Sequence, residues 1–169
     1  LDLANGEGSI IDLGCANGDF LYYLKNTVGP QWRLHGVDMT PDFIEDGRQW
    51  PGLEGVTLEV GDLLDLNRKY DVLVCSGTIQ IFPDIENVLQ TLLDSTNDGG
   101  WLFLDGQFNT FDVDTVFTYH DYSTKEGEGK WRCDFNIHSQ KRITTFLRDK
   151  VKDFDFMHLD MDIDLPQDP

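Results

Sequence analysis

The feature that most restricts the fold is a repeated alternation of short apolar runs with longer amphipathic segments, beginning almost at the first residue. Short apolar runs bounded by turn residues are typical of buried strands, and apolar residues spaced three and four apart are typical of helices. Strands are expected at residues 9–13, 32–38, 56–60, 70–75 and 101–105. Helices are expected between them at 18–28, 40–50 and 85–95. This order predicts an α/β fold with a doubly wound, mostly parallel sheet and helices on both faces.

Local signals support several of these boundaries. Thr40 followed by Pro41 offers a hydroxyl cap and a proline in the first turn of a helix, which the pair Pro51-Gly52 then stops. The consecutive apolar residues 72–74 favour a strand that is covered on both faces. Residues 97–100 have turn chemistry and are expected to precede the fifth strand.

The pattern changes after the fifth strand. Residues 106–138 carry aromatic and acidic residues without helical period, together with a glycine-and-charge patch at 125–130, so short strands or loops are expected there. A helix capped by Ser139 is expected at 139–152, and the alternation at 154–165 predicts a last strand. No linker interrupts the chain, so residues 1–169 are expected to form a single domain with a substrate-side excursion at 106–138.

The charge of the chain restricts its partners. The formal net charge is −18 and the sequence pI is about 4.2, which disfavours binding to nucleic acid and to anionic membranes. No apolar run reaches the length of a membrane-spanning segment and no signal peptide is evident, so the chain predicts no membrane partner. Its three cysteines, Cys15, Cys75 and Cys133, have no metal-type spacing and suit a reducing compartment, so the cytoplasm is expected.

The segment Ile-Ile-Asp-Leu-Gly-Cys-Ala-Asn-Gly-Asp at residues 10–19 is the most informative in the chain. A buried strand runs into small residues, and a helix begins at once. Gly14, Ala16 and Gly18 let the backbone turn tightly and let a ligand approach it. Asp38 ends the second strand, where a carboxylate can accept hydrogen bonds from ribose hydroxyls. The alternating spacing differs from the dinucleotide fingerprint, which has two residues before its last glycine.

These residues resemble the class I S-adenosylmethionine-dependent methyltransferases, with a Rossmann-like fold. The first motif matches as IIDLGCANG, with Ala16 in place of the middle glycine. The later motifs follow in order as HGVDMT, VGDLLDL, YDVLVCSGTIQIFPD and GGWLFLDG. The match extends from Ser9 to about Gly106, well over half of the chain. It implies S-adenosylmethionine as the cofactor.

The resemblance also implies how the cofactor is held. Asp12 and the backbone amides of residues 14–18 would meet its amino-acid end. Asp38 would hold the ribose, with Met39 packed on the adenine. Asp62 would bind the adenine amino group, with Leu63 beside it. The full expected cofactor set is Asp12, Gly14, Cys15, Ala16, Asn17, Gly18, Asp38, Met39, Asp62, Leu63, Ser76 and Gly77.

The acceptor side is less defined. Gln80 and Ile81 stand where a His pair is common in relatives, and Gln80 could orient an acceptor. His120 is the first candidate for a general base, because an imidazole suits removal of a hydroxyl proton. Tyr119 and Asp105 are weaker alternatives. The aromatic residues of the excursion either cover the acceptor or form a small satellite core. No metal site is expected, since no His or Asp spacing supports one.

The expected function is methyl transfer from S-adenosylmethionine to an O or N atom of a small metabolite or sugar. One alternative is a protein that binds this cofactor without catalysis, and another is a nicotinamide-dependent oxidoreductase. The family sheet normally has a seventh strand, so the last strands are expected to be truncated here. Exposed edge strands permit pairing with a second copy, and a homodimer is one alternative.

Overall fold

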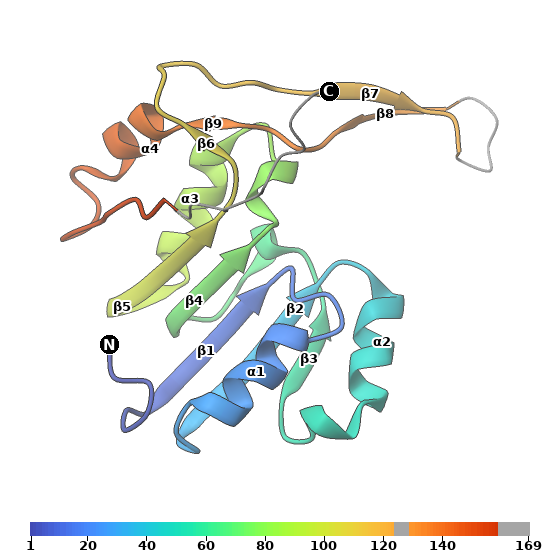
Figure 1. The fold of residues 1–169 in the computed structure, drawn as a ribbon, viewed down its shortest axis with the longest axis vertical. Coiled ribbons are helices and arrows are strands. Elements are labelled where there is room, and N and C mark those ends of the chain that lie inside the picture. Colours follow the sequence, from blue (N-terminus) through green and yellow to red (C-terminus); the bar gives the residue numbers. More distant parts are fainter. Residues whose placement is uncertain (124–128, 159–169) are drawn as a thin grey trace, which may run out of the picture.

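The protein is built around a parallel sheet of five strands in the order β3-β2-β1-β4-β5, seen in a computed structural model that describes residues 1–123 and 129–158 (Figure 1). The strands are β1 (Gly8–Leu13), β2 (Trp32–Asp38), β3 (Thr57–Val60), β4 (Tyr70–Ser76) and β5 (Thr96–Asp105). Strand order reverses between β1 and β4, which is where open α/β sheets bind their ligands. The predicted doubly wound sheet is confirmed.

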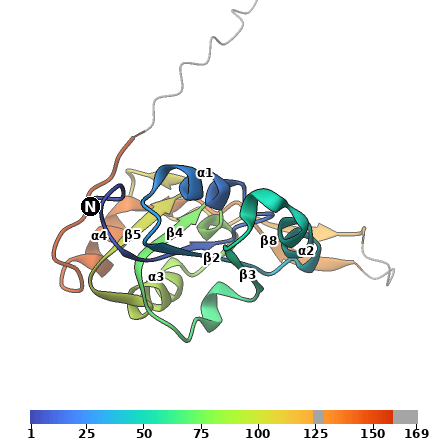
Figure 2. The same cartoon turned by 90° about the horizontal axis from the view of Figure 1, so that it is seen from below.

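Helices cover both faces of the sheet. Figure 2 shows α1 (Asp19–Thr27) on one side and α3 (Ile85–Asp94) on the other, and α2 (Pro41–Gln49) packs beside β3. Side chains alternate along β1, so that Ile10 joins the core under α1 and α2 whereas Ile11 joins the core under α3. The near-continuous apolar strands follow from this two-sided burial.

Strand β5 begins earlier than expected. Its register passes from Thr96 opposite Tyr70 to Trp101 opposite Val72, and Gly99 in between has a φ of 78°. The turn chemistry at 97–100 therefore makes a bulge within β5 instead of a separate turn before it.

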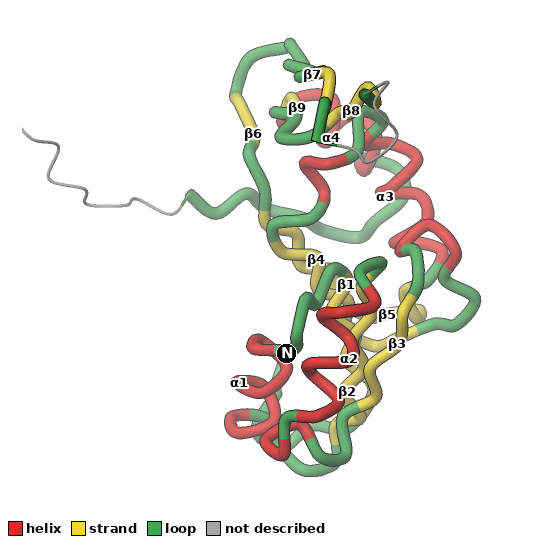
Figure 3. Tube along the Cα trace, turned by 90° about the vertical axis from the view of Figure 1, so that its right-hand side faces the viewer, coloured by secondary structure: helices red, strands yellow, loops and turns green. Residues whose placement is uncertain are grey.

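The excursion after β5 contains the expected short strands. They are β6 (Phe108–Asn109), β7 (Thr118–Asp121), β8 (Lys130–Cys133) and β9 (His138–Ser139). Strands β7 and β8 form an antiparallel ribbon, and β6 pairs with β9. Figures 1 and 3 place these strands beyond the carboxyl-terminal ends of the sheet strands. Most of the charged patch at 125–130 lies outside the described residues.

Two expectations near the end of the chain were wrong. The helix α4 (Gln140–Leu147) starts after its predicted cap, Ser139, whose Oγ accepts a hydrogen bond from the Arg142 amide, but it stops well before residue 152. Residues 154–158 form no strand, and 159–165 lie outside the described residues. Phe156 instead packs edge-on against Phe108 at 6.0 Å between ring centroids. An alternating pattern of apolar and polar residues forms a strand only where a neighbouring strand is available for pairing. Here Phe156 packs into the core instead.

Among the described residues, no helix has the length and apolar character required to cross a bilayer.

Candidate functional site

The expected cofactor residues come from the carboxyl-terminal ends of neighbouring strands. From one side of the sheet to the other, Asp62 follows β3, Asp38 ends β2, residues 14–18 follow β1, and Ser76 ends β4. Asp105, at the end of β5, completes the row. Because parallel strands all end at the same edge, the fold brings together residues that lie far apart in the sequence.

The turn after β1 is a tight, left-handed piece of backbone. Gly14, Ala16 and Gly18 have φ values of 79°, 48° and 93°. The amides of Gly14 and Cys15 both donate to the Val37 carbonyl, at 2.8 and 3.1 Å, which ties the turn to β2. The glycines are needed here because this region of φ disfavours residues with a Cβ.

Asp38 is the residue that links this turn to the end of β2. Its Oδ2 accepts a hydrogen bond from the Ala16 amide at 2.9 Å, and its Oδ1 accepts one from the Thr40 amide at 2.8 Å. Each carboxylate oxygen retains a further lone pair, so both can still accept a hydroxyl. Asp38 therefore fixes the shape of the turn and keeps acceptor capacity for a ribose.

Asp12 lies buried in the middle of this arrangement, with 4% of its surface exposed. Burial, with repulsion from Asp38 as the second cause, raises the pKa of Asp12 to about 7. Burial likewise raises the pKa of Cys15 to about 12, so that this thiol stays protonated at neutral pH. Cys15 thus contributes bulk to the site and no charge.

The loop after β4 closes over the glycine turn. A Cβ placed on Gly14 would lie 2.0 Å from Thr78 Oγ1, so the Thr78 side chain sits directly against Gly14. Ser76 Oγ donates to Asp105 at 3.1 Å, and the Gly77 amide donates to the Asp105 carbonyl at 3.2 Å. Sequence reasoning missed Thr78, for which the close packing of strand ends is the only signal.

The predicted adenine contacts have different surroundings. Asp62 is exposed, and its Oδ1 accepts a hydrogen bond from the Leu64 amide at 2.9 Å, which leaves its other oxygen free of described partners. Met39 is 67% exposed at the end of β2 and is open to a ligand. Leu63 is buried in the core under α3.

On the acceptor side, the excursion meets the loop after β4 at Gln80. The Gln80 carbonyl accepts a hydrogen bond from the Asn136 amide at 2.7 Å. Gln80 Oε1 and Asn136 Nδ2 are both buried and have no partner among the described residues. Sequence reasoning selected Gln80 but missed Asn136, which lies more than fifty residues further along the chain.

The two predicted residues of the β7–β8 ribbon, His120 and Tyr119, have different contacts. The His120 ring packs on Tyr122 and edge-on against Trp131, with centroids 4.5 and 5.0 Å away, and its Nδ1 has no described partner. The Tyr119 hydroxyl donates to Asp134, and this hydrogen bond raises the pKa of the phenol. The described contacts of both residues are with Tyr122, Trp131 and Asp134, and none of them joins either residue to the glycine turn.

Two other histidines have structural surroundings. His35 lies buried between Tyr70 and Glu59, and burial lowers its pKa. His138 is fully buried, and burial lowers its pKa as well. Within residues 1–123 and 129–158, no group of three or more His, Cys, Asp or Glu is placed to hold a metal ion.

The hydrogen-bond donors and acceptors at the strand ends are of the types that S-adenosylmethionine requires. The Asn17 amide has no acceptor among the described residues and can meet a carboxylate, while the carboxylates of Asp12, Asp38 and Asp62 can accept from amino and hydroxyl groups. A pocket of about 300 Å³ adjoins the turn, lined by Asn17, Asp19, Asp46, Gly47 and Trp50. A larger pocket of about 440 Å³ lies instead between α3 and α4.

The fold and these strand ends define a class of protein, the Rossmann-like α/β domains that bind a nucleoside at the switch point of the sheet. The family model described as a methyltransferase domain matches residues 4–149, so the chain belongs to the methyltransferase-domain family. This confirms the predicted methyltransferase class.

Individual relatives are more distant. Aklanonic acid methyltransferase DauC from Streptomyces sp. is 30% identical over 54% of this chain and 44% of its own length, so the chain spans less than half of this relative. The partner of the Trm112 methyltransferase activator from Haloferax volcanii is 19% identical, with a TM-score of 0.67 over 97% of this chain and 70% of that one. Magnesium protoporphyrin IX methyltransferase from Synechocystis, solved with bound SAM, is 16% identical, with a TM-score of 0.54 over 85% and 59%. These two structures establish likeness of fold.

Proposed function

We propose that the protein transfers the methyl group of S-adenosylmethionine to an O or N atom of a small metabolite or sugar. The observation that carries the proposal is the junction at Asp38, which joins the glycine turn to the end of β2 through the Ala16 and Thr40 amides. The junction supports the proposal because it joins the ends of β1 and β2 beside the switch point of a methyltransferase-family sheet, and because both oxygens of Asp38 can still accept a hydroxyl.

The bound cofactor would supply an electrophilic methyl group on a positively charged sulfur. The Asn17 amide and Asp12 would hold its amino-acid end, Asp38 its ribose, and Asp62 and Met39 its adenine. Methyl transfer is an in-line displacement, so holding donor and acceptor in line supplies much of the rate. Gln80 would orient the acceptor, and a hydroxyl acceptor would also need to lose a proton.

His120 is the proposed base, and the ribbon would have to bring it to the acceptor. If His120 acts in this way, His120→Ala should lower turnover by about 100-fold while cofactor affinity is unchanged. His158→Ala serves as the matched control, because it makes the same change at an exposed histidine to which no role is assigned, and it should leave turnover unchanged. Full turnover by His120→Ala would remove this residue from the mechanism.

Isothermal titration with S-adenosylmethionine tests the cofactor site without an acceptor. Asp38→Ala and Gly14→Arg should each weaken binding by at least about tenfold, since one loses the ribose carboxylate and the other fills the turn. Asp149→Ala, a change at an exposed residue in the turn after α4, should leave affinity unchanged. Wild-type affinity in both folded site variants would refute the cofactor site. Binding without methyl transfer to any small molecule would favour the alternative of a binding protein.

We also propose that the protein acts in the cytoplasm on small molecules, without nucleic acid as a partner. The net charge of −18 opposes phosphate binding, and Cys15 and Cys75 are free and buried.

A further inference from the structure

We propose that the acceptor is a neutral or cationic small molecule, and that the site disfavours carboxylate and phosphate acceptors. This inference rests on the proposed function, because it concerns the acceptor of the same site. It is carried by the charges around the carboxyl-terminal edge of the sheet and by two unpaired neutral groups at Gln80 and Asn136.

The loops at this edge contain no positive charge. Neither Lys nor Arg occurs in the segments that follow the five strands, namely residues 14–19, 39–42, 61–66, 77–84 and 106–117. Every one of these segments, taken with the adjoining strand end, carries at least one carboxylate, and the one after β4 is Asp84. An anionic acceptor at this edge would meet several carboxylates and no cation from these loops.

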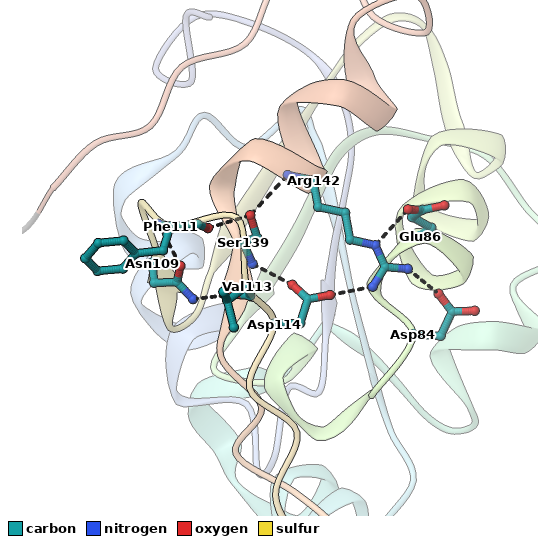
Figure 4. Close-up of polar contacts among 8 residues, drawn as sticks. All are labelled: Asp84, Glu86, Asn109, Phe111, Val113, Asp114, Ser139 and Arg142. Carbon is teal, nitrogen blue, oxygen red and sulfur yellow. Dashed lines mark hydrogen bonds and ion pairs between the residues drawn. The ribbon is translucent and has the colours of Figure 1, made fainter.

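The two cations at the start of α4, Lys141 and Arg142, are already paired with carboxylates. Figure 4 shows Arg142 of α4 reaching toward three carboxylates, with Nε at 2.7 Å from Glu86, Nη2 at 3.5 Å from Asp84, and Nη1 against Asp114. Lys141 pairs with Asp112. Arg142 and Lys141 line the pocket of about 440 Å³, but Glu86, Asp112 and Asp114 line it too. The pocket therefore carries no excess of positive charge for an anion.

The β7–β8 ribbon offers no better site for an anion. Arg132 pairs with Asp121 at 2.8 Å, and Lys130 stands directly opposite Asp121 in the register. Arg132 is therefore held within the ribbon, and Lys130 faces a carboxylate, which attracts its charge.

The neutral pair indicates what the acceptor offers instead. Asn136 is fully buried with Nδ2 unpaired, and the adjacent Gln80 has Oε1 unpaired, while the two residues are joined by the Asn136 amide and the Gln80 carbonyl. Buried polar groups without partners are costly and rare in folded proteins. One donor and one acceptor, both uncharged, match a hydroxyl, amine or amide better than a carboxylate, which can only accept.

The electrostatic part of the selectivity should depend on salt. Fixed carboxylates a few ångströms to about 10 Å from an acceptor disfavour an added negative charge by several-fold at low ionic strength. The effect should shrink as added salt shortens the Debye length.

The test uses matched acceptor probes that share a nucleophile and differ in charge, in a radiolabelled methyl-transfer assay. Glucose is compared with glucose 6-phosphate, and 4-hydroxyphenethyltrimethylammonium with 4-hydroxyphenylacetate. Transfer to the neutral or cationic member should exceed transfer to the anionic member by at least about threefold. This ratio should fall in about 0.5 M salt, because the Debye length shortens toward the value of about 3 Å that it reaches at 1 M. Equal or reversed preference overturns the inference, as does absence of transfer to any neutral or cationic probe while the cofactor binds. Failure to bind S-adenosylmethionine instead refutes the proposed function.

Variants separate charge from shape. Asp105→Asn keeps an oxygen that can accept from Ser76 Oγ and removes one charge, so the selectivity ratio should fall by about half or more. Asp149→Asn removes an exposed charge in the turn after α4 and should leave the ratio unchanged. Equal ratios in wild type and Asp105→Asn, with both proteins folded, would contradict the charge argument.

Discussion

Replacing Gly14 by alanine should destabilise the fold through one identifiable contact. Gly14 has a φ of 79°, and an added Cβ would lie 2.0 Å from Thr78 Oγ1 and 2.9 Å from Thr78 Cβ and Cγ2. The loop after β4 would have to withdraw from the turn after β1. Gly77 is a matched control in the same region, because its φ is 66° and an added Cβ would meet nothing within 4 Å.

Gly14→Ala and Gly77→Ala share the cost of backbone strain, and they differ in the cost of overpacking. A residue with a Cβ in left-handed backbone costs about 1–2 kcal/mol at either position. Only Gly14→Ala adds overpacking against Thr78, which typically costs about 1–3 kcal/mol. The free energy of unfolding should therefore fall by about 2–5 kcal/mol for Gly14→Ala and by about 1–2 kcal/mol for Gly77→Ala.

Urea unfolding followed by circular dichroism measures both changes. The double variant Gly14→Ala/Thr78→Ala should recover part of the lost free energy of unfolding, because it removes Thr78 Oγ1, the atom nearest the new methyl group. Equal destabilisation by Gly14→Ala and Gly77→Ala, or no recovery in the double variant, would refute the reasoning that Thr78 packs on the turn.

Three further changes test other parts of the structure by urea unfolding. The folded-state pKa of Asp12 is raised from 3.8 to about 7, so wild-type stability should fall as pH rises through that window, and Asp12→Asn should gain up to about 3 kcal/mol relative to wild type between about pH 5 and 7. A pH-independent difference would contradict this. Arg142→Gln should lower the free energy of unfolding by about 2 kcal/mol, a value discounted because Arg142 is partly exposed. Arg132→Gln, which breaks an exposed ion pair, should lower it by less than about 1 kcal/mol. Equal losses would argue against a stabilising role of the Arg142 cluster. Ser139→Ala should cost about 1 kcal/mol through loss of the α4 cap, and an unchanged midpoint would show that the cap is dispensable.

The sheet was predictable because each of its strands contains a short local pattern of apolar residues, either consecutive or alternating with polar ones. The predicted second strand, 32–38, coincides with β2, and the predicted helix 85–95 extends one residue beyond α3. Prediction failed where a segment's structure depends on its neighbours. The bulge at Gly99 exists because β5 must stay paired with β4, and the alternation at 154–158 gave no strand because Phe156 packs on Phe108.

The candidate site divides in the same way. The glycine turn, Asp38 and Asp62 could be selected because their spacing after successive strands is written in the chain. Their partners could not be selected. That Asp38 binds the Ala16 amide, and that Asn136 lies against Gln80, depends on which strands become neighbours.

The sequence by itself determined the alternation of strand and helix, the glycine turn with its small residues, and a net charge of −18. These are local or additive properties, which do not depend on the path of the chain. Only the tertiary structure decided that Thr78 covers Gly14, that Asp12 is buried beside Asp38, and that Arg142 is occupied by three carboxylates. Such contacts join residues distant in sequence, and only the packing of strands, helices and loops in the folded chain brings them within reach of one another.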